Sequence, residues 1–199
     1  MIWFCSDWHF SHDRDFVWKA RGFSSVGEMN NEIVKRHNSV VAEDDDVYVL
    51  GDLSMSANLE ANKILIESLK GKIHIVLGNH DTDNRIAMYK SCHNVVEVCG
   101  YATLLKHKKY RFYLSHYPTI TSNYSDATNP KDFTVNICGH LHTKEKYLHM
   151  KQGMMSYHVE MDANDCYPTS VDKIIEDLHF MSHQCDCDGN CGENCKCKK

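Results

Sequence analysis

Short apolar runs that end beside aspartate, asparagine or histidine recur five times along the chain. Runs of four to eight apolar residues bounded by polar or glycine residues are typical of β-strands, and unbroken runs favour strands buried on both faces. The pattern therefore predicts a layered protein whose strand ends carry metal-binding side chains. The five segments at these ends are Asp7-Trp8-His9, Gly51-Asp52, Gly78-Asn79-His80-Asp81, Ser115-His116 and Gly139-His140-Leu141-His142.

Six runs predict strands and three longer segments predict helices. The predicted strands are residues 2–5, 47–50, 73–77, 111–114, 135–138 and 156–161. The predicted helices are residues 25–38, 57–69 and 170–178. Ser25 and Glu28 are spaced as in a capping box at the start of the first helix. Strands alternate with helices over the first 90 residues and then follow one another, which predicts an α/β domain whose second half is largely antiparallel.

The composition limits the number of domains and the kinds of partner. A chain of 199 residues that is 42% hydrophobic and 25% charged fits one domain, residues 1–182, followed by a tail at 183–199. The net charge of -5 gives no overall positive field for nucleic acid or anionic membranes. No apolar stretch approaches the roughly 20 residues of a membrane span, so we expect a cytoplasmic location and no membrane partner. The sequence leaves the oligomeric state open.

Two pairs of candidate ligands share one spacing. Asp7 and His9 stand two residues apart where the first strand ends, so the period of an extended chain turns both side chains to one side. His140 and His142 repeat this spacing after the strand that ends at Cys138. The repetition indicates two strand ends that contribute to one site.

The donor types favour a dinuclear metal centre. Asp52 and Asn79 each follow a glycine, where backbones approach closely and strand ends converge. Carboxylate, amide and imidazole donors without thiolate suit divalent ions such as Mn, Fe or Zn. Two such ions held by two carboxylates keep a net positive charge even with a bridging hydroxide, and this charge suits an anionic phosphoryl group. Two metals roughly 3.5–4 Å apart activate a bridging water for in-line displacement, so we expect phosphate ester hydrolysis.

The leaving oxygen of that reaction needs a proton, and His80 is the expected donor. Asp81 follows it as a carboxylate able to hold the imidazole in one tautomer. His12 either reaches a substrate phosphate or a supporting carboxylate, or it caps the next helix. Arg85 is either a phosphate clamp or part of a solvated helix face, and we favour the solvated face.

The five segments resemble the signature of the calcineurin-like metallophosphoesterase superfamily over about residues 1–143. The resemblance implies a four-layer sandwich of two mixed β-sheets flanked by helices, with the ligands on loops at one edge. It implies that one metal is bound by Asp7, His9, Asp52 and His142, and the other by Asp52, Asn79, His116 and His140. Asp52 then bridges both metals. Manganese is the expected metal, with Fe, Zn or Ni as alternatives.

Residues outside the ligands narrow the resemblance. Asp52 is followed by Leu53-Ser54-Met55 and not by the Asp-Arg-Gly of protein serine/threonine phosphatases, which disfavours a phosphoprotein phosphatase. Longer strings resemble the small stand-alone phosphoesterases of bacteria and their phages, and they extend the resemblance to about residue 178. These strings are residues 6–12, residues 114–118 and Met161-Asp162-Ala163-Asn164. Because the last string also fits a turn, its Asp and Asn are left out of the predicted site.

Three functions compete. The leading prediction is a phosphodiesterase or phosphomonoesterase that acts on a small phosphate ester or a nucleotide, in a groove that admits both kinds of ester. A nuclease would use the same chemistry, but the chain is acidic overall and its most basic stretch, residues 106–111, is typical of a solvated hairpin. A non-catalytic scaffold on the same fold is disfavoured because every ligand position is filled.

The ten cysteines form two groups. The scattered ones are expected to be buried free thiols, and they are Cys5, Cys92, Cys99, Cys138 and Cys166. The tail holds Cys185, Cys187, Cys191, Cys195 and Cys197. Five thiols this close suit Zn(II) or Cu(I), but Cys-x-Cys spacing is unusual for zinc, and a disordered polar tail remains an equal alternative.

Overall fold

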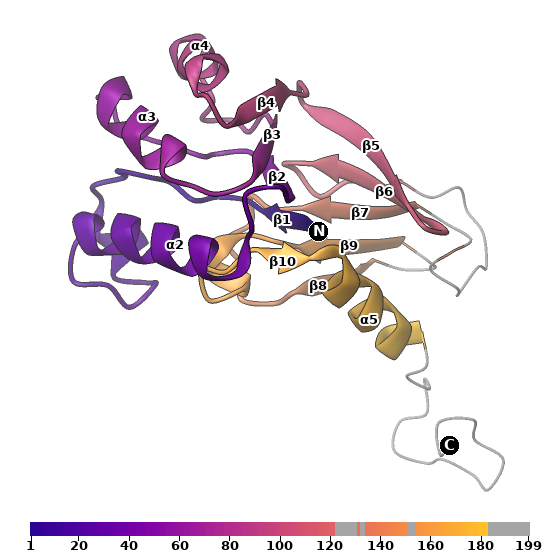
Figure 1. The fold of residues 1–199 in the computed structure, drawn as a ribbon. Helices are drawn as coiled ribbons and strands as arrows, with labels where there is room; N and C mark the ends of the chain where they lie inside the picture. The colour runs from indigo at the N-terminus through magenta and orange to yellow at the C-terminus, as the bar shows by residue number, and fades with distance from the viewer. Residues whose placement is uncertain (122–130, 132–133, 151–153, 183–199) are drawn as a thin grey trace, which may run out of the picture.

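The computed structural model describes residues 1–121, 131, 134–150 and 154–182, and its strands form two five-stranded sheets (Figure 1). The first sheet has the order β10-β1-β2-β3-β4 and the second β5-β6-β7-β9-β8. The first contains β1 (Ile2–Cys5), β2 (Asp46–Leu50), β3 (Lys72–Val76), β4 (Val95–Val98) and β10 (Thr169–Ser170). The second contains β5 (Ala102–His107), β6 (Tyr110–Ser115), β7 (Thr134–Cys138), β8 (Tyr147–Met150) and β9 (Met154–His158). The predicted tail, residues 183–199 with its five cysteines, lies outside the described residues.

Both sheets are mixed, which confirms the predicted fold class. In the first sheet β1 to β4 run parallel and β10 is antiparallel to β1. In the second sheet β6, β7 and β9 run parallel, and β5 and β8 are antiparallel edge strands. The prediction of a largely antiparallel second half was therefore wrong. The segments that join β6 to β7 and β7 to β9 are long enough for each strand to start again at the same end.

Helices cover the outer face of the first sheet (Figure 1). The helices on this face are α1 (Asp15–Trp18), α2 (Val26–Val40), α3 (Leu59–Glu67) and α4 (Asp83–Ser91). The other helical segments are α5 (Val171–Ser182) and the short 3-10 helix η1 (Met161–Ala163). Ser25 caps α2, since its Oγ accepts a hydrogen bond from the Glu28 amide at 3.1 Å. The Glu28 carboxylate instead binds the amide of Ser24, so only half of the predicted capping box forms.

The central strands of the first sheet, β1 to β3, pack on both faces, as their unbroken apolar runs predicted. Val47 and Ile73 pack on one face against α2, α3 and α4. Phe4 and Val76 point the other way and share a second core with the inner face of the second sheet. Helix α5 closes this second core with Leu178 and its neighbours. The two cores hold the sheets in a fixed relation, which positions the loops at their ends.

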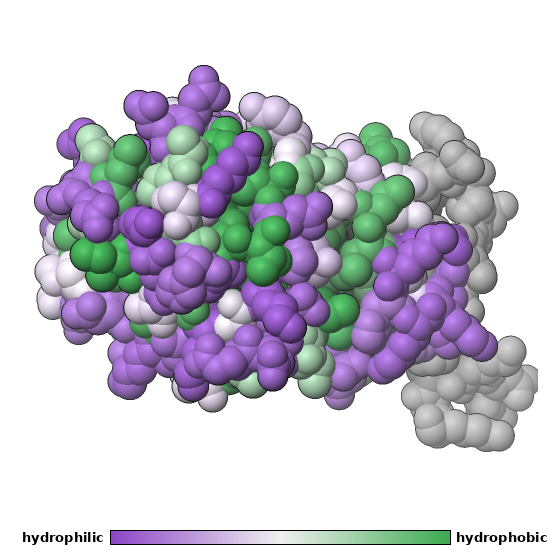
Figure 2. All heavy atoms as spheres, turned by 45° about the horizontal axis from the view of Figure 1, so that its top comes forward, coloured by the Kyte–Doolittle hydropathy of each residue, from purple (hydrophilic) through white to green (hydrophobic). Residues whose placement is uncertain are grey.

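The surface is mixed in polarity, and the scattered cysteines are free thiols as expected from the sequence. Figure 2 shows hydrophilic side chains over most of one face, with hydrophobic side chains in small groups between them, a mixture common on protein surfaces. Among the described ranges, no helix combines the length and the apolar character that crossing a membrane requires. The five scattered cysteines are free thiols, four of them buried and Cys99 partly so, as predicted.

Candidate metal centre

Strand ends from both sheets meet where the predicted ligands lie. The loop after β1 runs along the loop after β2, because the amide of Asp7 donates to the carbonyl of Gly51 at 3.0 Å. The loop after β7 is joined to the end of β6 by a hydrogen bond from the Gly139 amide to the carbonyl of His116, also 3.0 Å. The amide of Ser6 crosses between the sheets to the carbonyl of Val159. These backbone contacts bring five loops to one edge of the molecule.

Five of the predicted ligands have left-handed backbone conformations. Their φ angles are 56° for Asp7, 52° for His9, 55° for Asp52, 73° for His140 and 50° for His142. Such angles are uncommon for residues other than glycine, and they cluster at functional sites. The extended geometry assumed for the paired ligands is therefore wrong in detail. The chain leaves the strand before Asp7, and the left-handed turns aim the side chains.

Two glycines let these loops pack closely. Gly51 has a φ of 89°, and a Cβ there would lie 2.6 Å from Nδ1 of His116. A Cβ on Gly139 would collide with Ser6 Oγ and with a carboxylate oxygen of Asp7. Gly51 thus serves close approach, as expected from its place before Asp52, and Gly139 has the same role before His140.

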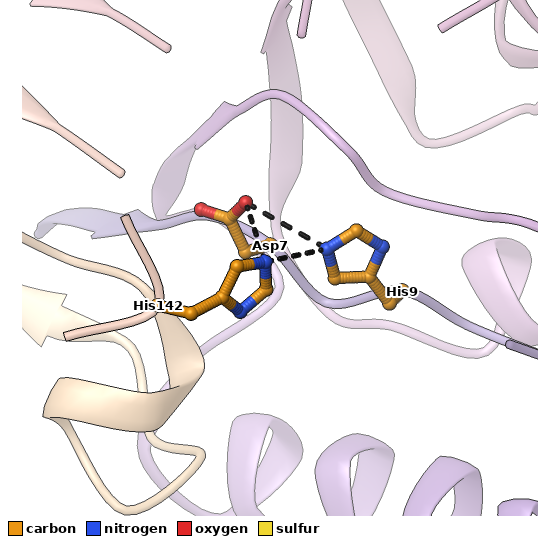
Figure 3. Close-up of side chains that lie close together, drawn as sticks. All are labelled: Asp7, His9 and His142. Atoms are coloured by element: carbon orange, nitrogen blue, oxygen red, sulfur yellow. Dashed lines mark hydrogen bonds and ion pairs between the residues drawn. The ribbon is translucent and has the colours of Figure 1, made fainter. Parts of the chain in front are cut away.

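One group of candidate ligands consists of Asp7, His9 and His142 (Figure 3). Nε2 of His9 lies 3.1 Å from Nε2 of His142, and each nitrogen lies 3.7 Å from Oδ1 of Asp7. That oxygen is buried and has no hydrogen-bond partner among the described residues. An orphaned carboxylate oxygen facing two imidazole nitrogens is a donor set that a divalent cation satisfies. The residues present therefore fit a metal ion at this position.

A second group surrounds His116. Its Nε2 lies 2.8 Å from Oδ1 of Asn79, 3.1 Å from Nδ1 of His140 and 3.6 Å from Oδ2 of Asp52. The same Asp52 oxygen lies 3.9 Å from Nε2 of His9 in the first group. Asp52 thus stands between the two groups. The structure brings all seven predicted metal ligands together.

Burial sets the charge states of the first group. It raises the pKa of Asp7 and lowers the pKa of His9 to about 2, with the neighbouring His142 and Arg21 adding to the second effect. The hydrogen bond to Asp162 raises the pKa of His142. A neutral His9 keeps a lone pair for a metal. A cation at the meeting point would also offset the cost of an ionised Asp7.

His80 and Asp81 occupy different environments. The His80 side chain is 46% exposed, and its Nε2 lies 3.9 Å from Oδ2 of Asp52. The Asp81 carboxylate points away from it: Oδ2 accepts the amides of Gly78 at 2.8 Å and Asp52 at 3.0 Å, and Oδ1 accepts the Tyr89 hydroxyl at 2.8 Å. The expectation that Asp81 orients the His80 imidazole therefore finds no support in these contacts. Asp81 fixes the loops that carry the ligands.

Two residues weighed from the sequence also take defined positions. The Arg85 guanidinium donates to the carbonyls of His80 and Met55, so it joins two loops and does not belong to a solvated helix face. The His12 ring lies 5.4 Å from the His9 ring, and its buried Nδ1 has no partner among the described residues. Burial lowers the pKa of His12.

The sequence did not place Asp162 or Arg21 in the site. Oδ2 of Asp162 lies 2.8 Å from Nδ1 of His142 and 2.9 Å from Arg21. Asn164, from the same string, binds the carbonyls of His158 and Glu160 and serves the turn. The string itself was a usable signal for Asp162, whereas no local pattern marks Arg21.

The basic stretch lies away from the centre. Residues 106–111 form the end of β5, the start of β6 and the turn between them. His116 follows the opposite end of β6. It comes six residues after Tyr110, where β6 starts, and is therefore about 20 Å away along the strand. This separation weakens the case for nucleic acid binding at the metal centre.

The fold and the site define a class: an α/β protein of two mixed sheets with a candidate metal centre of Asp, Asn and His at the strand ends. Residues 1–156 match the family model of the calcineurin-like phosphoesterase superfamily domain. The chain therefore belongs to this superfamily, and the predicted resemblance is confirmed.

Relatives of similar length exist in an archaeon and a phage. An uncharacterized protein of Methanocaldococcus jannaschii is 32% identical over 184 residues, which cover 88% of this chain and 89% of the relative. The Gene 66 protein of Mycobacterium phage L5 is 27% identical over 186 residues, covering 81% and 86%. The crystal structure of a protein of unknown function from Aquifex aeolicus has a TM-score of 0.66 at 22% identity, covering 88% and 98%. This structure shares the fold.

Proposed function

We propose that the chain is a metal-dependent hydrolase of phosphodiesters or phosphomonoesters whose alcohol part is a small organic group or a nucleoside. The observation that carries this proposal is the convergence of Asp7 Oδ1, which is buried and has no hydrogen-bond partner in the described part of the chain, with His9 and His142. The group around His116 lies beside it. One metal would be held by Asp7, His9, Asp52 and His142, and the other by Asp52, Asn79, His116 and His140. Manganese is the first choice, with Fe, Zn or Ni as alternatives.

When bound, the two metals would supply a hydroxide nucleophile at neutral pH and positive charge for the phosphoryl oxygens. The chain itself contributes the geometry. Asp52 lies between the two groups, with its Oδ1 held by the His80 amide at 2.9 Å and its own amide held by Asp81. Because both ends of this residue are fixed, its Oδ2 keeps one position between His9 and His116.

His80 is the proposed proton donor to the leaving oxygen. Its amide is tied to Asp52 and its carbonyl to Arg85, so the backbone is fixed while the imidazole stays accessible to solvent and substrate. A donor in this position protonates the leaving alkoxide as the ester bond breaks. Asp81 would serve this step indirectly, by holding the loop that carries His80.

Apolar side chains beside the centre favour a substrate with an organic group. Tyr117 is 48% exposed, and its ring lies 4.5 Å from the His140 ring and 5.2 Å from the His116 ring. Leu141, between the last two ligands, is 49% exposed. A planar group attached to the phosphate can pack on such a surface.

Hydrolysis of a substrate panel tests the proposal. The full chain with added Mn is given bis-p-nitrophenyl phosphate, p-nitrophenyl phosphate, cyclic nucleotides and single-stranded oligonucleotides, with and without a chelator. We expect metal-dependent release of product from the small esters. Preference for oligonucleotides would favour the nuclease, and metal binding without turnover of any ester would favour the scaffold.

The role of His80 has its own test. His80→Ala should lower kcat about 10²–10⁴-fold while the chain still binds two metals. His93→Ala is the matched control, since His93 is an exposed histidine whose contacts with Glu67 lie outside the predicted metal centre. Equal rates for His80→Ala and the unmodified protein would remove His80 as the donor.

We further propose that residues 1–182 form the catalytic domain and that the cysteines of residues 183–199 bind a soft metal ion. The support is the density of thiols in the sequence. Metal content by mass spectrometry is compared between the full chain and a chain that ends at Gln184. Equal content would leave the tail as a polar segment without metal.

A further inference from the structure

We infer that Arg21 and Asp162 are positioning residues for one of the two metals, the one bound by Asp7, His9 and His142. The inference rests on the proposed function and adds a pair of residues that lie outside the ligand motifs. The Arg21 guanidinium contacts the loop after β1, and the Asp162 carboxylate contacts His142 in the loop after β7.

Arg21 and Asp162 form a paired, buried contact. The Arg21 side chain is 2% exposed and that of Asp162 13%. Nε of Arg21 lies 3.0 Å from Oδ1 of Asp162, and Nη2 lies 2.9 Å from Oδ2. A two-point contact between these planar groups fixes the orientation of both.

The other donors of Arg21 hold the loop after β1. Nη2 donates to the carbonyl of Asp7 at 2.8 Å and Nη1 to the carbonyl of Trp8 at 3.0 Å. These carbonyls lie within the turn where Asp7 and His9 take left-handed conformations. Arg21 therefore stabilises the turn that aims both ligands.

Asp162 fixes the ring of His142. Its Oδ2 accepts the Nδ1 proton of His142 at 2.8 Å, which leaves the lone pair on Nε2. That Nε2 faces His9 and Oδ1 of Asp7 (Figure 3). A carboxylate behind a histidine in this way selects the tautomer that binds metal through the other nitrogen.

The second group of ligands is supported differently. Nδ1 of His116 donates to the backbone carbonyl of Leu50 at 2.8 Å. Arg21 and Asp162 make no described hydrogen bond to Asn79, His116 or His140. Their loss should therefore weaken one metal site and spare the other.

Manganese binding, measured apart from hydrolysis, tests the inference. Calorimetric titration with Mn(II), and metal analysis after loading, should give two ions per chain for the unmodified protein. Asp162→Asn should lower the affinity of one ion about 10–100-fold and leave the other unchanged. Asp177→Asn is the matched control: this carboxylate is similarly buried, binds the Tyr157 hydroxyl and Lys173, and lies outside the site. It should keep two ions.

Two further variants separate positioning from folding. If Asp162→Asn does not fold, by circular dichroism and thermal melting, Arg21→Gln combined with Asp162→Asn removes the pair without leaving a buried unpaired charge, and the same selective loss is expected. In a His142→Ala background, Asp162→Asn should lower Mn(II) affinity by clearly less than it does in the unmodified protein, because the contact with His142 is already absent and only the contact with Arg21 is lost.

The outcomes distinguish this inference from the proposed function. Two ions bound with unchanged affinity in folded Asp162→Asn would overturn the inference while hydrolysis by the unmodified protein still stands. Equal weakening of both ions, or a full additional loss in the His142→Ala background, would overturn it as well. An unmodified protein that binds no Mn(II) and hydrolyses no ester would overturn both.

Discussion

Removing the Asp81 carboxylate should destabilise the whole domain and not only slow the reaction. Its Oδ2 accepts two backbone amides, those of Gly78 and Asp52, in a position that is 8% exposed. Asp81→Ala leaves both amides buried without an acceptor. The Tyr89 hydroxyl also loses its partner, but it retains Ser54 Oγ at 3.2 Å.

The magnitude follows from these contacts. A buried donor left without a partner costs about 1–3 kcal/mol, so two amides cost about 2–6 kcal/mol of unfolding free energy. Whole domains have only about 5–15 kcal/mol. Asp81→Asn should cost about 1 kcal/mol, because the amide oxygen still accepts from the backbone while its NH₂ group faces the Tyr89 oxygen. Tyr89→Phe removes the hydrogen bonds of this hydroxyl to Asp81 and to Ser54 and should cost about 1–3 kcal/mol.

Urea unfolding of these variants, each without added metal, measures the effect. The control is Asp83→Ala, an exposed aspartate at the start of α4, which should change stability by less than about 1 kcal/mol. An unfolding free energy for Asp81→Ala equal to that of the unmodified protein would refute the loop-fixing role. If Asp81→Asn lost as much turnover as His80→Ala without a change in stability, the tautomer role expected from the sequence would be restored.

Three further outcomes are expected. Gly139→Ala should reduce Mn(II) affinity and destabilise the fold by about 1–3 kcal/mol, since its Cβ collides with Ser6 and Asp7; calorimetry and urea unfolding that match the unmodified protein would contradict this. Burial lowers the pKa of His37 to about 4, whereas in the unfolded chain it is about 6.5, so the unfolded state alone binds a proton between these values. His37 therefore contributes full stability above pH 6.5, and about 2 kcal/mol is lost by pH 5; His37→Gln should lose correspondingly less over that range in denaturant titrations. Tyr117→Ala should raise KM for aryl and nucleoside esters but not for a methyl ester, and equal KM changes for both would argue against stacking on Tyr117.

The sequence predicted the parts of the fold that depend on local patterns. The cores of β1, β2, β3, β6 and β7 were all found, because unbroken apolar runs mark strands buried on both faces. Helix α4 was missed, because its apolar and polar residues are not separated onto two distinct faces of the helix. Strand direction in the second sheet was also wrong, because it depends on how a long connection returns and not on the strand's own residues.

The site was predictable where chemistry and position coincide. Asp7 and His116 are ligand types at strand ends, and a sequence shows both properties directly. The contact between Arg21 and Asp162 was not predicted, because the two residues are 141 positions apart and no nearby residue in the sequence reveals the pair. For Asp81, the sequence neighbour was the wrong guide. The adjacent His80 suggested a hydrogen-bond partner, whereas the Asp81 carboxylate accepts hydrogen bonds from the backbone and from Tyr89.

The carboxylates of Asp81 and Asp162 support the predicted metal centre in different ways. Asp81 binds main-chain amides, so it stabilises the loops of Asp52 and Gly78 whether or not a metal is present. Asp162 binds a ligand's imidazole, so it matters chiefly for how His142 meets the metal. A left-handed backbone conformation at a residue other than glycine costs about 1–3 kcal/mol of folding free energy, and it persists only where surrounding contacts hold the residue. Most of the predicted ligands have this conformation. Because backbone contacts from Asp81 and Arg21 hold the ligand loops, the folded chain should present its donors before any metal binds. A chelator should then abolish hydrolysis while leaving most of the unfolding free energy in place.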